Sequence, residues 1–413
     1  MSKLQTTPSG WKLTTLGTFM EFKNGVNADK NAYGSGTEFV NVMDIFKRNF
    51  MKKCSILGKV EITEKQKAEY SVKYGDILFN RTSEVPDEIA FSSVYLDEAE
   101  ITFGGFVIRG RQKKELLDPL FAGYCFNNSS IRREMIRRSQ GVVRANIGQK
   151  DLNKVPILIP PKDEQKKIAS VLALWDNAIE KTEALITAKE KQFEWLTSNL
   201  INRAGHKRTA ASGLMTEISK RNKSSTIERV LSVTNHSGFV LPEEQFERRV
   251  ASANVSNYKV VEQGQYAYNP SRINVGSIAR LDDWENGILS PMYVVFKLDT
   301  KKVCSDYFLH WLNSSEARQR IKNSAQGSVR ETVSFKDLGA IDIPLPAMDV
   351  QKDVTYKLNL AQKEISLLKK TLEQYRSQKS GLMQKLLTGE WQVSSTQLAA
   401  EGTLQELSKE SVA

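Results

Sequence analysis

The strongest constraint on this chain is an internal repeat, which becomes visible when the sequence is compared with itself so that position 141 lies opposite position 327. We call this displacement the repeat offset. Residues 141–152 (GVVRANIGQKDL) then lie opposite residues 327–338 (GSVRETVSFKDL), and six of the twelve positions are identical. At the same offset, residues 155–160 (VPILIP) lie opposite residues 341–346 (IDIPLP). An offset that stays constant over this length indicates a diverged tandem duplication.

The N-terminal part of each half, which we call its front, is much less similar between the halves than the C-terminal part, which we call its back. Residues 74–80 (YGDILFN) resemble residues 263–269 (QGQYAYN), but at a slightly longer offset. Residues 103–109 and 292–297 are predicted to form core strands of the two fronts. A structural duplication explains the similar backs. The divergence of the fronts is expected if each front recognises a different target.

The composition indicates a basic protein with more than one domain. At about 100–200 residues per domain, a chain of 413 residues predicts two to four domains. The 59 Lys and Arg residues exceed the 48 Asp and Glu residues, so the net charge is +11. This balance favours an anionic partner, with nucleic acid as the first candidate. A basic protein without such a partner remains the alternative.

The three cysteines, Cys54, Cys125 and Cys304, lie far apart and predict neither a disulfide framework nor a CxxC metal pair. The N-terminal residues show no apolar signal segment, and no run of about eighteen apolar residues predicts a membrane span. We therefore expect a cytoplasmic protein with no membrane partner.

The back of each half is predicted to be a long helix that follows a short strand. Residues 155–159 alternate apolar side chains, Pro160 and Pro161 stop the strand, and apolar residues then recur at heptad spacing. Two such helices from a duplicated chain are expected to pair antiparallel about an approximate two-fold axis. The alternative is that each helix packs only on its own domain. The predicted seam comprises Ile168, Leu172, Trp175, Ile179, Ile186 and Phe193 in the first helix, and Leu358, Ile365, Leu368 and Leu372 in the second.

Motifs for chemistry are missing from the sequence. There is no GxxxxGK[ST] phosphate loop, and His206, His236 and His310 have no companion ligands at metal spacing. Residues 268–272 (YNPSR) only faintly resemble the Asn-Pro-Pro-aromatic motif of amino-methyltransferases, and no Gly-rich methyl-donor loop accompanies them. We therefore assign no catalytic residue, no metal ligand and no cofactor to this chain.

Basic and amide side chains in both fronts are candidates for DNA contacts, because Lys and Arg bind phosphates and Arg or Asn can read base edges. The loops with Arg144 and Arg330 are the stronger candidates, since a preceding Gly permits a close backbone approach. Their alternative role is to cap or bridge the following Lys-Asp pair, and the alternative for the 132–138 arginine run is a solvated helix face. The candidates are Asn80, Arg81, Thr82, Ser83, Arg109, Arg111, Arg133, Arg137, Arg144, Asn146, Asn269, Ser271, Arg272, Arg280, Arg320, Arg330 and Thr332.

These features together resemble the specificity subunits of type I restriction-modification systems. Residues 160–168 (PPKDEQKKI) are similar to that family's helix entry, although residues 345–351 (LPAMDVQ) depart from it by having Val350 in place of Glu. Residues 386–390 (LLTGE) resemble the end of the family's second helix, and residues 10–25 resemble its domain opening.

The resemblance implies an α+β fold, with two target recognition domains of mixed sheet and helices in a pseudo-two-fold tandem repeat, separated by two long antiparallel coiled-coil helices. It implies domains at 1–160 and 227–346, spacer helices at 161–202 and 347–388, and a tail at 389–413. The segment 203–226 is rich in small, polar and basic residues and is predicted to be a linker.

By the same resemblance, each domain reads half of a bipartite double-stranded DNA site, and the helices dock two modification subunits that use S-adenosylmethionine. Two restriction subunits that use ATP and Mg²⁺ can join that complex. Two other classes remain open: an enzyme, either a fused methyltransferase or a nuclease, and a coiled-coil scaffold that does not touch nucleic acid.

Overall fold

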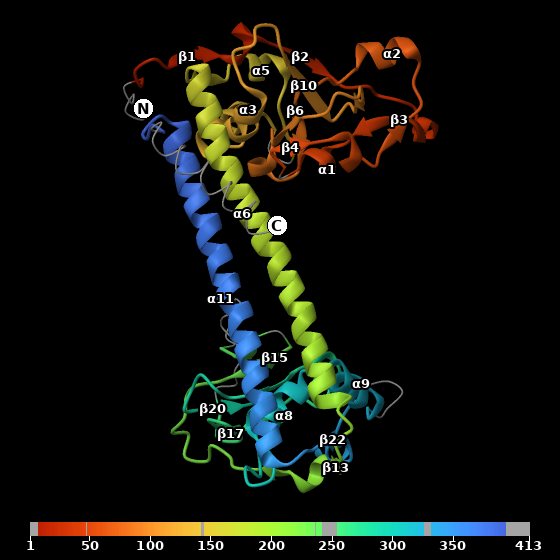
Figure 1. The fold of residues 1–413 in the computed structure, drawn as a ribbon, viewed down its shortest axis with the longest axis vertical. Coiled ribbons are helices and arrows are strands. Elements are labelled where there is room, and N and C mark those ends of the chain that lie inside the picture. The colour runs from red at the N-terminus through yellow and green to blue at the C-terminus, as the bar shows by residue number, and fades with distance from the viewer. Residues whose placement is uncertain are drawn as a thin grey trace, which may run out of the picture. The chain divides into compact units, whose positions relative to one another are not determined.

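The computed structural model describes residues 7–46, 48–141, 144–235, 237–241, 254–325 and 332–393. It divides into two compact units (Figure 1): unit 1 comprises Met1–Lys181 and Leu372–Ala413, and unit 2 comprises Thr182–Thr371. Two long helices, α6 (Lys162–Thr197) and α11 (Met348–Leu387), each contribute residues to both units. Among the described residues, no helix is both long and apolar enough to cross a membrane.

Unit 1 is built on a five-stranded sheet in the order β2-β10-β6-β8-β4, antiparallel except for the pairing of β4 with β8. Its strands are β2 (Met20–Asn24), β10 (Val107–Gln112), β6 (Ile77–Asn80), β8 (Ser92–Tyr95) and β4 (Phe50–Met51). A second sheet has the order β5 (Lys59–Val60), β3 (Tyr33–Val40) and β9 (Thr102–Phe103), and two-stranded pairs join β1 (Lys12–Thr15) to β12 (Pro156–Ile159) and β7 (Thr82–Ser83) to β11 (Ala145–Asn146). The shorter helices are α1 (Val42–Ile45), α2 (Glu64–Glu69), α3 (Pro119–Phe126), α4 (Ser129–Arg138) and α5 (Gln149–Asn153).

Unit 2 repeats this plan with a smaller sheet in the order β14-β21-β18-β19, in which every pairing is antiparallel. Its strands are β14 (Met215–Ile218), β21 (Val294–Leu298), β18 (Tyr266–Tyr268) and β19 (Ile278–Arg280). Further pairs join β13 (Arg208–Ala210) to β22 (Asp342–Pro344), β15 (Ser232–Thr234) to β16 (Gly238–Val240), and β17 (Lys259–Glu262) to β20 (Asn286–Leu289). The shorter helices are α8 (Ser305–Leu312), α9 (Ser315–Asn323) and α10 (Phe335–Gly339).

The predicted linker at 203–226 is wrong, because this range contains β13 and β14. β13 pairs antiparallel with β22, and β14 is an edge strand of the unit 2 sheet, so both belong to the second domain. Small and basic residues suggested a loop, but pairing with a strand far along the chain overrides this local composition.

The repeat found in the sequence is also a repeat of secondary structure. Five elements of the second half begin at the repeat offset from their counterparts in the first: α8 from α3, α9 from α4, α10 from α5, β22 from β12, and α11 from α6. The predicted core strands correspond to β10 and β21, which occupy equivalent places in the two sheets, but the strands begin at Val107 and Val294, after the predicted starts at residues 103 and 292. The tandem duplication is therefore confirmed as two copies of one fold.

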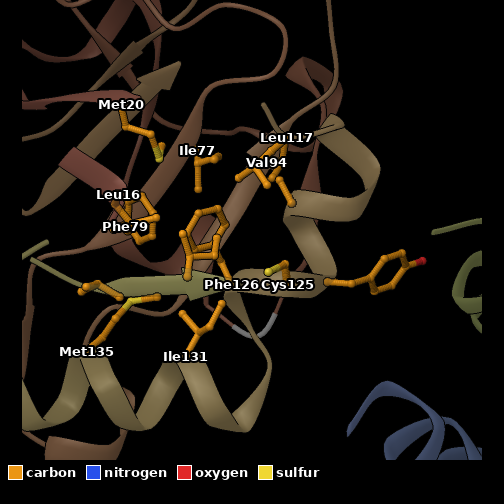
Figure 2. Packing of buried hydrophobic residues seen from close by; sticks show 14 of the residues in the cluster. Leu16, Met20, Ile77, Phe79, Val94, Leu117, Cys125, Phe126, Ile131 and Met135 are labelled. Atoms are coloured by element: carbon orange, nitrogen blue, oxygen red, sulfur yellow. The ribbon is translucent and has the colours of Figure 1, made fainter. Parts of the chain in front are cut away.

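Helix α3 forms the centre of the unit 1 core. Six of its residues, Phe121 to Phe126, are buried, as expected for a helix that is apolar on all sides. Asp118 caps its first turn by accepting hydrogen bonds from the backbone N–H groups of Leu120 and Phe121. Figure 2 shows Phe126 beside Phe79 of the sheet, with Ile131 and Met135 of α4 below them. The rings of Phe79 and Phe126 meet edge to face at 5.3 Å.

A buried glutamine fixes each long helix to its domain. Gln165 accepts a hydrogen bond from the Asp118 N–H (2.7 Å) and donates to the carbonyl oxygens of Leu116 (2.8 Å) and Pro160 (2.9 Å). In unit 2, the equivalent residue of the repeat, Gln351, has the same pattern. It accepts from the Cys304 N–H (2.8 Å) and donates to the carbonyl oxygens of Lys302 (3.2 Å) and Pro346 (2.9 Å). We call these two arrangements the glutamine clasps.

The two long helices run antiparallel beside each other within each unit. In unit 1, where the start of α6 and the end of α11 lie side by side (Figure 1), the rings of Trp175 and Tyr375 meet at 5.6 Å. In unit 2, ion pairs join Lys189 to Glu364 (2.9 Å) and Glu190 to Lys369 (2.7 Å). The predicted antiparallel pairing is therefore confirmed within each unit.

The helices also pack on the domains, but the alternative in which each helix packs only on its own domain is wrong, because each helix also contacts the other helix and the core at its far end. Ile168 and Leu172 lie in the unit 1 core together with Leu386 and Leu387 from the far end of α11. Leu358 lies in the unit 2 core, and Phe193 packs against that core from the far end of α6. Of the other predicted seam residues, Ile186, Ile365 and Leu372 are buried, and Trp175, Ile179 and Leu368 are half-buried.

Candidate DNA-binding interface

Each unit carries an asparagine that shapes the loop after an inner strand of its main sheet. The Asn80 Oδ1 atom accepts a hydrogen bond from the Thr82 N–H (3.2 Å), and the Asn269 Oδ1 atom accepts one from the Ser271 N–H (3.0 Å). Both asparagines are buried. They hold the loops in shape and do not present their amides to solvent, which argues against the predicted DNA contacts for these two residues.

In unit 1, this loop is joined to the segment that contains Arg144. β7 pairs with β11, placing Ala145 opposite Ser83 and Asn146 opposite Thr82. The Arg144 side chain is 58% exposed and donates to Glu84 at 3.3 Å. The structure thus brings together four of the predicted site residues: Thr82, Ser83, Arg144 and Asn146.

Gly141 makes this arrangement possible. Its φ of +106° is a left-handed conformation, and a Cβ atom there would lie 2.2 Å from the carbonyl oxygen of Arg144. A residue with a side chain would therefore clash with the backbone. Gly141 thus shapes the loop itself, and the expected close approach of this backbone to DNA stays a prediction.

A cavity of about 510 Å³ opens beside this pair of loops. Asn80, Thr82, Ser83 and Arg144 line it, together with residues that the sequence analysis did not select. The additional lining residues are Val42, Met43, Phe46, Glu84, Val85, Glu88 and Phe106. The cavity is therefore bounded by both apolar and charged side chains.

Unit 2 joins its two equivalent loops in the same way. The Val333 N–H donates to the Pro270 carbonyl at 3.1 Å, as the Ile147 N–H donates to the Arg81 carbonyl at 3.0 Å in unit 1. Ser271 and Arg272 are exposed, and Thr332, which precedes Val333, is half-buried. Arg330 lies outside the described residues.

Three predicted arginines are held inside the domains instead of being presented to a ligand. Arg109 is 5% exposed, donates to the Ser71 carbonyl and lies 5.6 Å from the centre of the Phe103 ring. Burial lowers its pKa. The Arg109 side chain is therefore buried within the domain. Removing a guanidinium from water is costly, and the Ser71 carbonyl and the Phe103 ring offset part of that cost.

Arg111 and Arg280 are bound by carboxylates. Arg111 makes two hydrogen bonds to Asp76, at 2.8 and 2.6 Å, and these raise the pKa of Arg111. Burial lowers the pKa of Arg280, but hydrogen bonds to Asp282 and Asp306, both at 2.6 Å, raise it above its usual value. With Arg109, these residues stabilise the domains, and the structure does not support their assignment to the interface.

The arginines of the short helices differ in their surroundings. Arg133 and Arg137 are exposed, and Arg137 pairs with Glu134 (2.8 Å) on the same helix, which fits the solvated-face alternative. Arg320 pairs with Glu316 at 2.7 Å. Arg132, which we did not select as a site residue, is buried and lies 4.0 Å from the centre of the Phe91 ring.

Metal-binding groups are not found in the part of the chain that the structure describes: no group of three His, Cys, Asp or Glu residues there could hold a metal ion. Cys54, Cys125 and Cys304 are free thiols, and burial raises the pKa of Cys125 to about 12. His310 is buried, and its Nε2 atom lies 2.6 Å from Asn359 Oδ1. His236 lies outside the described residues.

The two units therefore repeat one arrangement of sheet, short helices and joined loops. Residues 8–189 match the family described as "Type I restriction modification DNA specificity domain".

Relatives are similar over nearly the whole chain. The chain is 25% identical to a Methanocaldococcus jannaschii protein named as a putative type I restriction enzyme specificity subunit (MjaX), with 94% of this chain and 95% of that protein covered. It is 21% identical to the MjaVIII specificity subunit of the same organism, covering 94% of each. These matches confirm the resemblance to type I specificity subunits.

Solved structures share the fold. The S subunit of the type I restriction-modification system from M. genitalium is 16% identical with a TM-score of 0.53, covering 93% of this chain and 98% of that one. The HsdS subunit from Thermoanaerobacter tengcongensis is 14% identical with a TM-score of 0.52, covering 94% and 99%. The predicted fold class, two mixed domains with long helices, is thereby confirmed.

Proposed function

We propose that this chain is the non-catalytic specificity subunit of a type I restriction-modification complex, and that each recognition domain reads one half of a bipartite DNA site. The observation that carries the proposal is the loop pair of each unit, because one backbone arrangement recurs with different side chains on it. In unit 1 the loop after β6 presents Thr82 and Ser83, whereas in unit 2 the loop after β18 presents Ser271 and Arg272. Conserved geometry with different side chains suits two readers of different half-sites.

A domain exchange tests this proposal. Replacing Trp11–Leu158 with the corresponding domain of a relative of different specificity should change one half of the recognised sequence and leave the other half unchanged. The site is identified by mapping methylated positions in host DNA with and without the gene. A change in both halves would contradict the division of labour between the domains.

The proposal also assigns the chemistry to other subunits. S-adenosylmethionine would bind the modification subunits, and ATP and Mg²⁺ would bind the restriction subunits. The experiment is an assay of the purified chain alone for methylation and cleavage of DNA. Either activity in this chain would favour the enzyme alternative, and binding that ignores sequence at raised salt would favour a scaffold, because such binding is mostly counterion release.

The helices are proposed to dock the two modification subunits. Within unit 2, Tyr356, Leu360 and Leu367 of α11 are 69%, 58% and 54% exposed. Their spacing of four and seven residues places them along one face of the helix. An exposed apolar stripe of this kind suits a partner helix.

A charge placed on this stripe tests the docking proposal. The variant Leu360→Glu should abolish co-purification with the modification subunit, whereas Leu13→Glu, at an exposed apolar residue of β1, should not. Equal co-purification of both variants with the wild type would remove this face from the proposed docking surface.

A further inference from the structure

Phe106 and Met292 are exposed apolar residues at the same position of the two domains. They are separated by the repeat offset, and each lies in the turn that leads into the equivalent core strand, β10 or β21. Phe106 is 65% exposed and Met292 is 59% exposed. We infer that these two side chains are equivalent apolar contacts to DNA bases, one in each half-site. The inference rests on the proposed function.

A second pair of exposed apolar residues accompanies them. Val85 follows Asn80 in the loop after β6 and is 49% exposed, and Val275 follows Asn269 in the loop after β18 and is 61% exposed. Among the described residues of unit 2 outside the long helices, the large apolar side chains that stay exposed are Val275 and Met292. Val275 lies in the loop after β18, and Met292 lies in the turn before β21.

Core packing does not account for this coincidence. Single apolar residues on a surface are common and need no explanation. The fronts of the two domains have diverged, however, and an exposed position is free to become polar without loss of packing. Retention of a large apolar side chain at equivalent exposed places in both domains points to a shared ligand with apolar surface.

The turn that carries Phe106 is held firmly by the rest of the domain. The Arg81 N–H donates to the Phe106 carbonyl at 2.9 Å, and the Arg81 side chain donates to the Gly105 carbonyl at 3.1 Å. A Cβ atom on Gly25 would lie 2.1 Å from the Gly104 carbonyl oxygen, so the neighbouring backbone packs directly on this turn. A side chain presented from such a turn loses little conformational freedom on binding.

Met292 is likewise placed beside the loop-shaping asparagine of its domain. The Asn269 side-chain amide lies 3.7 Å from the Met292 Sδ atom. In unit 1, Asn80 and Phe106 line the same cavity. The two domains therefore share an arrangement of buried asparagine, shaped loop and exposed apolar side chain.

The chemistry of the unit 1 cavity favours bases over phosphates as the partner of Phe106. Glu84 and Glu88 line the cavity and would repel a phosphate, whereas exposed Met43, Val85 and Phe106 offer apolar surface. Bases offer two apolar features, the thymine methyl group in the major groove and the ring faces exposed when a wedge residue enters a base step. Arg144, which also lines the cavity and has an exposed side chain, can bind a neighbouring DNA phosphate.

The test compares apolar truncations with a matched control. A recognition site is selected from random duplexes using the full-length chain assembled with modification subunits, and binding to that site and to a scrambled duplex is measured across a range of salt. Phe106→Ala and Met292→Ala should each weaken specific binding by roughly tenfold to a hundredfold, the effect of losing one buried apolar side chain. Leu13→Ala, an exposed apolar truncation away from the loops, should leave it unchanged.

Two further readouts separate an apolar base contact from other roles. Binding to the scrambled duplex and the salt dependence should not change, because no phosphate contact is removed. Replacing thymine by uracil at one position should weaken the wild type but not Phe106→Ala if the contact is a methyl group. Fluorescence of 2-aminopurine at the half-site should rise with the wild type alone if Phe106 enters a base step.

The inference is overturned if folded Phe106→Ala and Met292→Ala bind as tightly as the wild type, or if they lose specific and scrambled binding equally. The variant Phe106→Leu guards against a folding artefact, since it keeps an apolar side chain and should retain most of the affinity. A wild type that selects no sequence would instead contradict the proposed function, so the two failures are distinguishable.

Discussion

The two units use the same backbone plan but different side-chain chemistry where the far end of a long helix meets a domain. In unit 1, Tyr124 donates to Asp176 (2.6 Å), and Lys379 binds Asp176 while its ammonium lies 5.4 Å from the centre of the Tyr124 ring. In unit 2, the residue equivalent to Tyr124 is His310, which contacts Asn359 (2.6 Å) and the Phe193 ring (5.9 Å).

Lys379 and Phe193 are themselves separated by the repeat offset. The same position of the repeat is therefore occupied by a cation, Lys379, in unit 1 and by an aromatic ring, Phe193, in unit 2. The difference teaches that the helix ends are not interchangeable, because each is matched to its own domain by local chemistry. The glutamine clasps, by contrast, are the same in both units.

The largest effect is expected from breaking a clasp. Gln165→Leu and Gln351→Leu each leave one backbone N–H and two carbonyl oxygens without their side-chain partner, so each should cost about 2–4 kcal/mol of unfolding free energy. Urea unfolding measures the cost, and hydrogen exchange should show loss of protection confined to the unit that carries the substitution.

Gln319→Leu is the matched control, because Gln319 is exposed and bonds only to Asn323 on its own helix in the described structure. It should change stability by less than about 0.5 kcal/mol. A large cost at only one of the two clasps would show that the units are not equivalent at this point.

Placing Lys at position 193 and Phe at position 379 should lower the free energy of unfolding by unequal amounts. Phe193→Lys removes a half-buried ring that packs on the unit 2 core and brings an ammonium beside His310, for a cost of about 2–3 kcal/mol. Lys379→Phe leaves Asp176 bound to Tyr124 and partly exposed, for a cost of about 1 kcal/mol. Thermal unfolding of the two single variants and the double exchange measures this; a stable double exchange would mean that the ends are interchangeable.

In the proposed DNA-binding loops, loss of charge should weaken DNA binding, whereas the exchanges above should change stability. Arg144→Ala should weaken binding by about 1–3 kcal/mol if the side chain reads a base, and should lower the salt slope by about one if it binds a phosphate. Arg330→Ala tests the equivalent position of unit 2. Unchanged affinity of folded Arg144→Ala at every salt concentration would remove this residue from the interface.

The smallest expected effect is a pH dependence specific to unit 2. Burial lowers the pKa of His310 below its ordinary value of 6.5. The neutral form is therefore favoured in the folded state, and its contribution is fully present above pH 6.5. It is lost as the pH falls through the folded-state pKa, because the unfolded chain takes up the proton first.

His310→Gln should flatten this part of the stability profile, since an amide does not titrate. Urea unfolding of the wild type and the variant at pH 7.5 and 5.5 measures the difference. Tyr124, the equivalent residue of unit 1, does not titrate in this range. Hydrogen exchange at the same two pH values should therefore show loss of protection in unit 2, and a similar loss in unit 1 would contradict the assignment to His310.

The sequence was sufficient to predict features that depend on short-range pattern. The repeat, the strand before the proline pair and the two long helices follow from periodicity and from chain-breaking residues. Heptad spacing could not show that Ile168 and Leu172 lie in a domain core, because any apolar partner satisfies the same pattern.

The failures concern features fixed by distant parts of the chain. The burial of Arg109 depends on how the rest of the domain covers β10, and the pairing of β13 depends on β22, which lies far along the chain. Phe106 and Met292 were missed as site residues because apolar residues of a predicted core strand look alike whether they point inward or lie in the preceding turn. The signal that could have found them is their common position in the repeat.

The sharing of helix ends between units has a consequence for how the protein is made. Leu386 and Leu387 belong to the same core as Trp11 and Leu16, so the first domain cannot complete its core until nearly the whole chain has left the ribosome. At about 5–20 residues per second, a nascent first domain would hold an uncovered apolar surface for tens of seconds. Chains terminated before α11 would keep that surface exposed, and should be bound by chaperones and degraded instead of accumulating as free recognition domains.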